Sequence, residues 1–382
     1  MIVVIAVAVL VLGIAFFQVV QGTFSALVMA FLSILCALLA LNYFEPLSAA
    51  LLLERMPGYA HGASLLALFV LPLLALRYLF DTFIPGNAVM GVWIDRIGGG
   101  VLGIVTGLVC VGVLMLVLQM LPLGASVLGY RPYDASLGRQ QSLAPFQPDR
   151  FVTGLAEVTS AGSLSGSGGR FGLRHDDLPL ELFCARNEAG IGARTDCLPD
   201  ALRVEGAYDV TTDNPAWVSE LPTYPLRQGA APGKVIVLRV SVSETARQGE
   251  EQPGANWWLL PATHFRLVCE DGRSVYPIGY LTGRARLASQ PPGTATPAAW
   301  KLHAPEVVES KLQMTALAVA RPYANEKEIA VDWVFEVPTE AKPAYVVFRR
   351  VSAGTISDVQ IGPLPSALQA DALVRIETPP RR

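Results

Sequence analysis

Charged residues are almost missing from the first third of this chain. Between Met1 and Gly124 the formally charged residues are Glu45, Glu54, Arg55, Arg77, Asp81, Asp95 and Arg96, and the first lysine of the sequence is Lys234. The chain of 382 residues is 52% hydrophobic and only 16% charged, whereas an average soluble domain is about 25% charged. Acids, bases and prolines become ordinary beyond residue 125, so the sequence predicts two chemically different halves.

Other residue types that mark particular functions are also scarce. The net charge is −3, and the longest basic runs are the pairs Arg349–Arg350 and Arg381–Arg382, which argues against a nucleic-acid binder. The four histidines stand in no recognisable catalytic motif, and the five cysteines form no closely spaced ligand set. We therefore expect no catalytic residue, no cofactor and no metal site.

The cysteines suggest packing and one disulfide. Cys36 and Cys110 lie in apolar runs, where cysteine usually acts as a small packing residue. Cys184 and Cys197 bracket a short loop and could form a disulfide in an oxidising compartment. Closing so short a loop would add roughly 3 kcal/mol of stability. The fifth cysteine, Cys269, is assigned neither of these roles.

Four long apolar runs predict four membrane-spanning helices. We place them at Ile2–Val20, Phe24–Tyr43, Ser64–Phe83 and Gly98–Leu121, because about 20 apolar residues cross roughly 30 Å of hydrocarbon. A signal peptide would need a basic start, and the first basic residue is Arg55.

The segment between the second and third runs is apolar but interrupted. Residues 44–62 contain Glu45, Pro46, Glu54 and Arg55. This pattern predicts a short interfacial amphipathic helix rather than another span.

Two pairs of charges flank the loop between the third and fourth runs. Arg77 and Asp81 lie one helical turn apart, and Asp95 and Arg96 open the fourth run. Pairing of Arg77 with Asp95, or of Asp81 with Arg96, would lower the cost of charges at the hydrocarbon edge. A proton or ion relay is the alternative, but it needs ionisable groups through the membrane depth, and the first two helices lack them. We favour the structural role.

Glycines recur at every fourth position of the last apolar run, as Gly99, Gly103 and Gly107. A phosphate-binding loop would need a lysine after the last glycine, and Leu108 stands there instead. Four-residue spacing keeps the glycines on one helix face, where they let another helix approach closely.

The stretch "DRIGGGVLGIVTG" resembles the signature that opens the last helix of the colicin V production protein family. Asp95, Arg96 and the three glycines occupy the corresponding positions, and Gly22 and the region from Tyr43 to Leu47 are also similar. Gln21 stands where the family often has arginine. The resemblance covers about the first third of the chain. It implies that both termini lie outside the cytosol, and it implies an association with toxin production.

The region after the fourth run is predicted to be a linker with one helix. Pro148–Thr159 forms the helix, at the membrane surface, with Phe151, Val152, Leu155 and Val158 on one face. His175 stands beside two aspartates. We expect a solvated polar loop there rather than part of a catalytic triad, which needs ordered supports on several elements.

The C-terminal half alternates as β-strands do. The stretch "KVIVLRVSVS" alternates apolar faces, and Asp271–Gly272 predicts a hairpin turn. Together with "AVDWVFEVP" and "AYVVFRRV", these strands favour an all-β immunoglobulin-like sandwich. The expected domains are an all-α transmembrane domain at 1–124, a linker at 125–200, a β-sandwich at 201–355 and a tail at 356–382.

These features predict an integral protein of the inner or plasma membrane that carries an extracytosolic binding domain. We expect a non-enzymatic scaffold or accessory factor in toxin production, export or envelope processes. Its expected partners are the lipid bilayer, other membrane or envelope proteins, and further copies of itself. A transporter or channel component is one alternative and needs polar lining along the helices. A membrane-tethered hydrolase is the other and needs a convergent nucleophile and base.

Overall fold

The computed structural model divides the chain into two compact units. The helical unit contains residues 1–132 and 140–183, and the β unit contains residues 133–139 and 184–382. The structure describes residues 2–83, 91–123, 133–134, 139–140, 147–161, 170–186, 193–210, 233–247, 258–282, 301–303, 306–308, 311–313, 316–319, 327–356 and 361–362. The predicted tail beyond Gly362 lies outside these residues.

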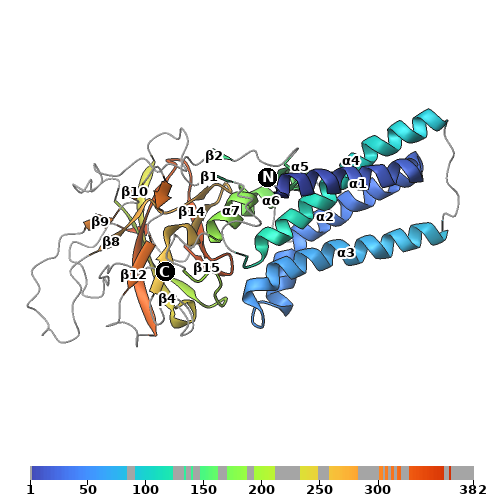
Figure 1. Cartoon of the computed structure of the whole chain (residues 1–382). Helices are drawn as coiled ribbons and strands as arrows, with labels where there is room; N and C mark the ends of the chain where they lie inside the picture. The colour runs from blue at the N-terminus through green and yellow to red at the C-terminus, as the bar shows by residue number, and fades with distance from the viewer. Residues whose placement is uncertain are drawn as a thin grey trace, which may run out of the picture. The chain divides into compact units, whose positions relative to one another are not determined.

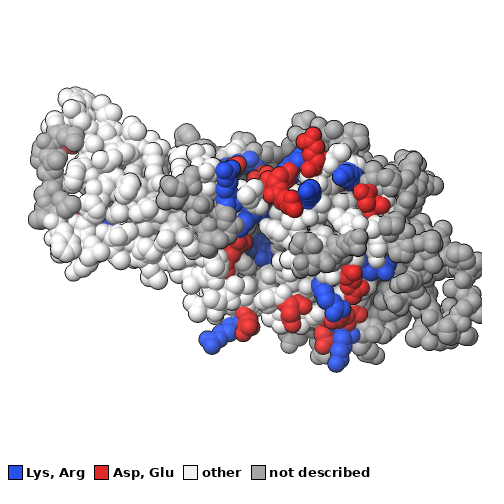
Figure 2. Space-filling view, turned by 180° about the vertical axis from the view of Figure 1, so that it is seen from behind, with Lys and Arg blue, Asp and Glu red and all other residues white. Residues whose placement is uncertain are grey.

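Four long helices form the body of the helical unit (Figure 1). They are α1 (Ile2–Gln21), α2 (Thr23–Leu51), α3 (Pro57–Phe83) and α4 (Val92–Met120). All four are long and apolar enough to cross a membrane, and the visible surface of the helices carries almost no charge (Figure 2). The four helices indicate a membrane protein, as the sequence predicted.

The second helix is longer than predicted. α2 continues through Pro46 to Leu51, and α3 begins at Pro57. The separate interfacial helix expected over residues 44–62 is therefore wrong, because its residues extend α2 and α3. α2 ends where the amides of Leu52 and Leu53 both donate to the carbonyl of Ser48, at 2.9 Å.

Three shorter helices lie at one end of the bundle, the end that also holds the N-terminus of α1 (Figure 1). They are α5 (Pro148–Ser160), α6 (Phe171–Arg174) and α7 (Leu178–Ala185). α5 covers the residues of the predicted linker helix and is one residue longer. Val152, Ala156, Phe171, Leu178 and Leu182 belong to the same buried cluster as the apolar residues of α2, α3 and α4. These helices are thus a packed part of the helical unit rather than a linker.

The β unit is built from short strands in several sheets. A six-stranded sheet has the order β16-β3-β4-β13-β8-β9, and a four-stranded sheet has the order β15-β14-β6-β7. Two-stranded sheets pair β12 with β5, β10 with β11, and β1 with β2. The strand bounds are β1 (Tyr133–Asp134), β2 (Arg139–Gln140), β3 (Leu202–Asp209), β4 (Lys234–Ser243), β5 (Trp258–Pro261), β6 (Phe265–Cys269), β7 (Ser274–Val275), β8 (Gly279–Thr282), β9 (Lys301–His303), β10 (Glu306–Val308), β11 (Lys311–Gln313), β12 (Ala316–Val319), β13 (Glu328–Val337), β14 (Pro343–Phe348), β15 (Ser352–Thr355) and β16 (Ile361–Gly362).

The two larger sheets share one apolar core. Phe265 of β6 lies 4.7 Å from Trp333 of β13 and 4.6 Å from Phe348 of β14, measured between ring centroids. Ile356 is buried in the same core, and β16 pairs in parallel with β3. The β unit therefore extends beyond residue 355, where the sequence predicted a tail to begin.

A buried arginine holds several segments of the β unit together. Arg349 follows β14 in a left-handed turn with φ of 48° and is 1% exposed. Its guanidinium donates to the carbonyls of Asp196, Ala246 and Leu259 at 2.9, 3.1 and 3.3 Å, and to Nδ1 of His264 at 3.3 Å. Burial lowers its pKa to about 10, so the side chain remains charged at neutral pH.

The predicted disulfide between Cys184 and Cys197 is not formed in the structure. Both side chains are buried, and Cys197 belongs to the β-unit core. Its thiol points to the carbonyl of Phe348 at 3.8 Å. Burial raises the pKa of this thiol to about 11, so Cys197 acts as a small packing residue.

Candidate functional site

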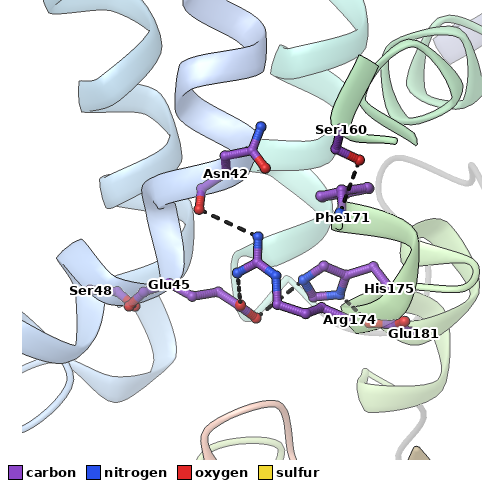
Figure 3. A network of polar contacts seen from close by, with 8 residues as sticks. All are labelled: Asn42, Glu45, Ser48, Ser160, Phe171, Arg174, His175 and Glu181. Atoms are coloured by element: carbon purple, nitrogen blue, oxygen red, sulfur yellow. Dashed lines mark hydrogen bonds and ion pairs between the residues drawn. The ribbon is translucent and has the colours of Figure 1, made fainter. Parts of the chain in front are cut away.

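Four charged side chains meet where α2 contacts α6 and α7 (Figure 3). The Glu45 carboxylate accepts from Nη1 of Arg174 at 3.0 Å and lies 3.2 Å from Nε2 of His175. Nδ1 of His175 lies 2.8 Å from the carboxylate of Glu181. We call Glu45, Arg174, His175 and Glu181 the junction cluster. Its two cations and two anions balance in charge.

A proline in α2 helps create this contact. Pro46 has no N–H to donate to the carbonyl of Asn42, four residues earlier, so that carbonyl lacks its usual donor within the helix. Nη2 of Arg174 lies 3.4 Å from this oxygen (Figure 3). One guanidinium therefore binds both the backbone carbonyl that the proline frees and the carboxylate of Glu45.

Side chains also fix the short helices that supply Arg174, His175 and Glu181. Ser160 at the end of α5 accepts from the amide of Phe171, at the start of α6, at 3.0 Å. Asp177 precedes α7 and accepts from the amide of Leu180 at 3.2 Å, which is an N-cap. The other oxygen of Asp177 pairs with Arg150 of α5 at 3.0 Å. The three helices are thereby held to one another before they meet α2.

His175 is the centre of the junction cluster. It is 6% exposed, and its ring lies 6.1 Å from Phe44 and 5.1 Å from Phe171. His61 of α3 packs against the edge of Phe44 at 5.8 Å. Burial by itself would lower the pKa of His175, but Glu181 and Glu45 outweigh it and raise that pKa to about 9. The ring is therefore a buried imidazolium at neutral pH, and the ion pairs of the cluster hold α6 and α7 to α2.

In the part of the chain that the structure describes, no group of three or more metal-ligating side chains is arranged to hold an ion. Because its pKa is raised to about 9, the His175 ring is mostly protonated at neutral pH, and in that form both its nitrogens carry protons.

The expectation that His175 lies on a solvated loop was wrong. The stretch after Arg170 looks like a loop in the sequence because α6 is only four residues long and His175 has two aspartates beside it. The partner of His175 and Arg174 lies about 130 positions away, at Glu45, and no local pattern reveals it. The one signal in the sequence is an acid directly before a proline inside an otherwise apolar run.

At the opposite end of the bundle, the predicted charges make other contacts. Arg77 pairs with Asp81 on its own helix at 3.1 Å and donates to Oγ of Ser25 on α2 at 3.0 Å. Asp95 accepts from the amide of Thr23 at 3.4 Å. Among the described residues, neither predicted cross-hairpin pair, Arg77 with Asp95 or Asp81 with Arg96, is formed. The reason is that Arg77, Asp81 and Asp95 have nearer partners. Arg96 is exposed.

Asp95 instead serves the turn between α1 and α2. Gly22 has φ of 90°, which glycine adopts without strain, and it starts α2 without a side chain to cap it. The amide of Thr23 donates to Asp95, and the Thr23 hydroxyl donates to the carbonyl of Ile94 at 2.9 Å. A carboxylate is favourable at a helix N-terminus, so α4 supplies the cap that α2 lacks.

The three glycines of α4 face α1. A Cβ atom added at Gly103 would lie 2.7 Å from Cα of Ala15, and one at Gly99 would lie 2.9 Å from the carbonyl oxygen of Gln18. At Gly107 the nearest atom would be the carbonyl oxygen of Val11, at 3.0 Å. The distances at Gly99 and Gly103 are shorter than real Cβ contacts, and the distance at Gly107 is tighter than most, so α1 and α4 touch along their backbones.

Another glycine of α4, Gly112, also allows a close approach that the sequence did not predict. A Cβ atom at Gly112 would lie 2.6 Å from Cγ2 of Val152 and would also clash with the carbonyl of Pro148. Gly112 thus admits α5 to the surface of α4, where Gln119 donates to the buried Asp149 at 3.2 Å.

The fold and the junction cluster define a class of protein, namely a membrane protein in which ion pairs hold short helices against the helical bundle. Comparison of the chain with family models, with curated proteins and with solved structures found no match.

Proposed function

We propose that this protein is a non-enzymatic membrane scaffold that presents its β unit to other membrane or envelope proteins. We also propose that the chain is related to the colicin V production family and has an accessory role in toxin production, export or envelope processes. In this proposal the β unit is extracytosolic and immunoglobulin-like. The junction cluster is the observation that carries the scaffold. Its ion pairs fasten α6 and α7, which are the last helices before the β unit in the chain, to the membrane helix α2.

The polar side chains inside the helices support a scaffold over a transporter. Ser33 donates to the carbonyl of Ala30 at 2.9 Å, and Thr106 donates to that of Leu102 at 3.0 Å. Both hydroxyls satisfy carbonyls of their own helix rather than line a path. A hydrolase is disfavoured because the imidazole at the junction is held as a cation.

The scaffold can be tested with an amine-reactive crosslinker that does not cross membranes. The first lysine of the chain is Lys234, so apart from the amino terminus such a reagent modifies the β unit alone. Lys327 and Lys342 are exposed there. We expect crosslinking of intact cells to modify these lysines and to join the β unit to a small, reproducible set of membrane or envelope proteins.

Different results would refute different parts of the proposal. Modification of the lysines only after cell lysis would place the β unit in the cytosol. Modified lysines without any protein partner would refute the scaffold, as would ion flux or substrate turnover by the purified full-length protein in liposomes. A matched control is the Glu157→Gln variant, which changes an exposed carboxylate of α5 and should leave the crosslinks unchanged.

A further inference from the structure

The surface of α5 is divided lengthwise into three strips. The first is buried against the bundle and contains Asp149, Val152, Ala156 and Ser160. The second is polar and contains Arg150, Thr153 and Glu157. The third is apolar, with Phe151, Leu155 and Val158 spaced by four and three residues, so that they share one helix face.

The apolar strip is only partly packed. Phe151 is 37% exposed and Val158 is 76% exposed, and Leu155 is half-buried at the edge of the core. Gly154, beside them, has no atom within 4 Å of the position its Cβ would take. The exposed parts of Phe151 and Val158 are therefore free to contact another apolar surface.

The position of α5 along α4 indicates that occupant. α4 has 29 residues and is about 43 Å long, whereas the hydrocarbon layer takes about 30 Å, or about 20 residues. A layer centred on the helix runs from about Arg96 to about Leu116, which places the charged pair at Asp95 and Arg96 at one boundary. α5 contacts α4 at Gly112 and at Gln119, and these residues lie on the two sides of the other boundary.

We propose that α5 lies in the boundary layer of the bilayer and that Phe151, Leu155 and Val158 contact lipid acyl chains. Interfacial helices bury an apolar face roughly 5–10 Å below the headgroups and keep their polar face in water. The strips of α5 have this order, because the apolar strip and the polar strip flank the buried strip on opposite sides. The inference rests on the membrane insertion of α1 to α4, which is part of the proposed function.

The test uses a photoreactive side chain in the full-length protein reconstituted in liposomes. The variants are Phe151→p-benzoylphenylalanine and Val158→p-benzoylphenylalanine. Glu157→p-benzoylphenylalanine is the matched control on the polar strip, and Phe16→p-benzoylphenylalanine reports the lipid-facing side of α1, where Phe16 is 71% exposed. After irradiation, mass spectrometry measures the fraction of each variant that carries a lipid adduct.

We expect at least a fivefold higher yield of lipid adducts at positions 151 and 158 than at position 157. A yield at 151 no higher than at 157, with adducts present at position 16, would overturn the inference and leave membrane insertion intact. Crosslinks from position 151 to a second copy of the chain would overturn it in favour of self-association. Loss of adducts at position 16 as well would overturn membrane insertion and the inference together.

Discussion

Replacing His175 by glutamine should remove a specific part of the pH dependence of stability. The pKa of this imidazole rises from an ordinary value of about 6.5 to about 9 in the folded protein. Each pKa unit corresponds to about 1.4 kcal/mol, so the protonated ring contributes on the order of 3 kcal/mol to the stability of the helical unit. The ring is nearly inaccessible to solvent, so solvent screening reduces this contribution little.

The direction follows from proton binding in the two states. Below pH 6.5 the ring is protonated whether the protein is folded or not, and the contribution is complete. Between about pH 6.5 and 9 the folded protein holds a proton that the unfolded chain has released. Stability therefore falls as pH rises through this window, and above about pH 9 the contribution is lost.

The assay is thermal or denaturant unfolding of the full-length protein in nanodiscs at several pH values from 6 to 10. Circular dichroism at 222 nm follows the helical unit. We expect His175→Gln to be less stable than wild type at pH 7 by about 3 kcal/mol, because Glu45 and Glu181 lose the cation between them. We also expect its stability to change much less than that of wild type between pH 7 and 9.

Two results would refute the reasoning. One is a wild-type stability that is constant from pH 7 to 9, and the other is an equally steep decline in His175→Gln. Titration of the His175 ring by NMR gives an independent check, because a pKa below 7 would show that the carboxylates do not outweigh burial. Glu157→Gln serves as the control for removal of a polar group from an exposed site.

Two further substitutions test other contacts. Gly103→Leu should separate α1 from α4 and destabilise the helical unit by about 1–3 kcal/mol in nanodisc unfolding, because its Cβ would lie 2.7 Å from Cα of Ala15. The control is Gly13→Leu, which has nothing within 4 Å and should have little effect. Equal effects of the two substitutions would contradict the packing role. Arg349→Met should destabilise the β unit by about 2–4 kcal/mol, since it leaves buried carbonyls without donors. Near-UV circular dichroism during unfolding measures this loss, and Arg203→Met, at a side chain that is 68% exposed, is the control whose effect must be smaller.

The four membrane helices could be predicted because hydropathy over 20 residues depends on composition alone. The end of α2 could not, since a glutamate followed by a proline usually marks the end of a helix. In the structure the missing hydrogen bond at Pro46 is replaced by one from Arg174. A contact between residues so far apart depends on the tertiary structure, and local propensity carries no information about it.

The charges near the α3–α4 loop illustrate a different limit. Their location at a helix end is visible in the sequence, but their partners are not. Asp95 binds the amide of Thr23 rather than an arginine, because the uncapped start of α2 lies closer to it. A sequence pattern shows opposite charges readily, whereas a backbone amide that lacks a cap becomes apparent only once the turn at Gly22 is known.

The strands of the β unit were predictable for a similar reason, since alternation is local. β4 and β13 occupy the stretches predicted as strands, but their burial is nearly continuous rather than alternating, so both of their faces are covered. Their order within the sheets depends on which strands meet across long connections, and single-strand patterns do not determine it. The buried position of Arg349 was likewise not predictable, because its carbonyl acceptors, Asp196, Ala246 and Leu259, come from three segments far apart in the sequence.

The bond between Arg174 and Glu45 also has a consequence for biosynthesis. The two residues are separated by 129 positions, which a ribosome adds in on the order of 10 s at roughly 5–20 residues per second. During that interval α2 is already made, with Glu45 and the open carbonyl of Asn42 in contact with water at its end. Synthesis of α6 then replaces that water, so the bundle reaches its final form only when the segment leading to the β unit has left the ribosome.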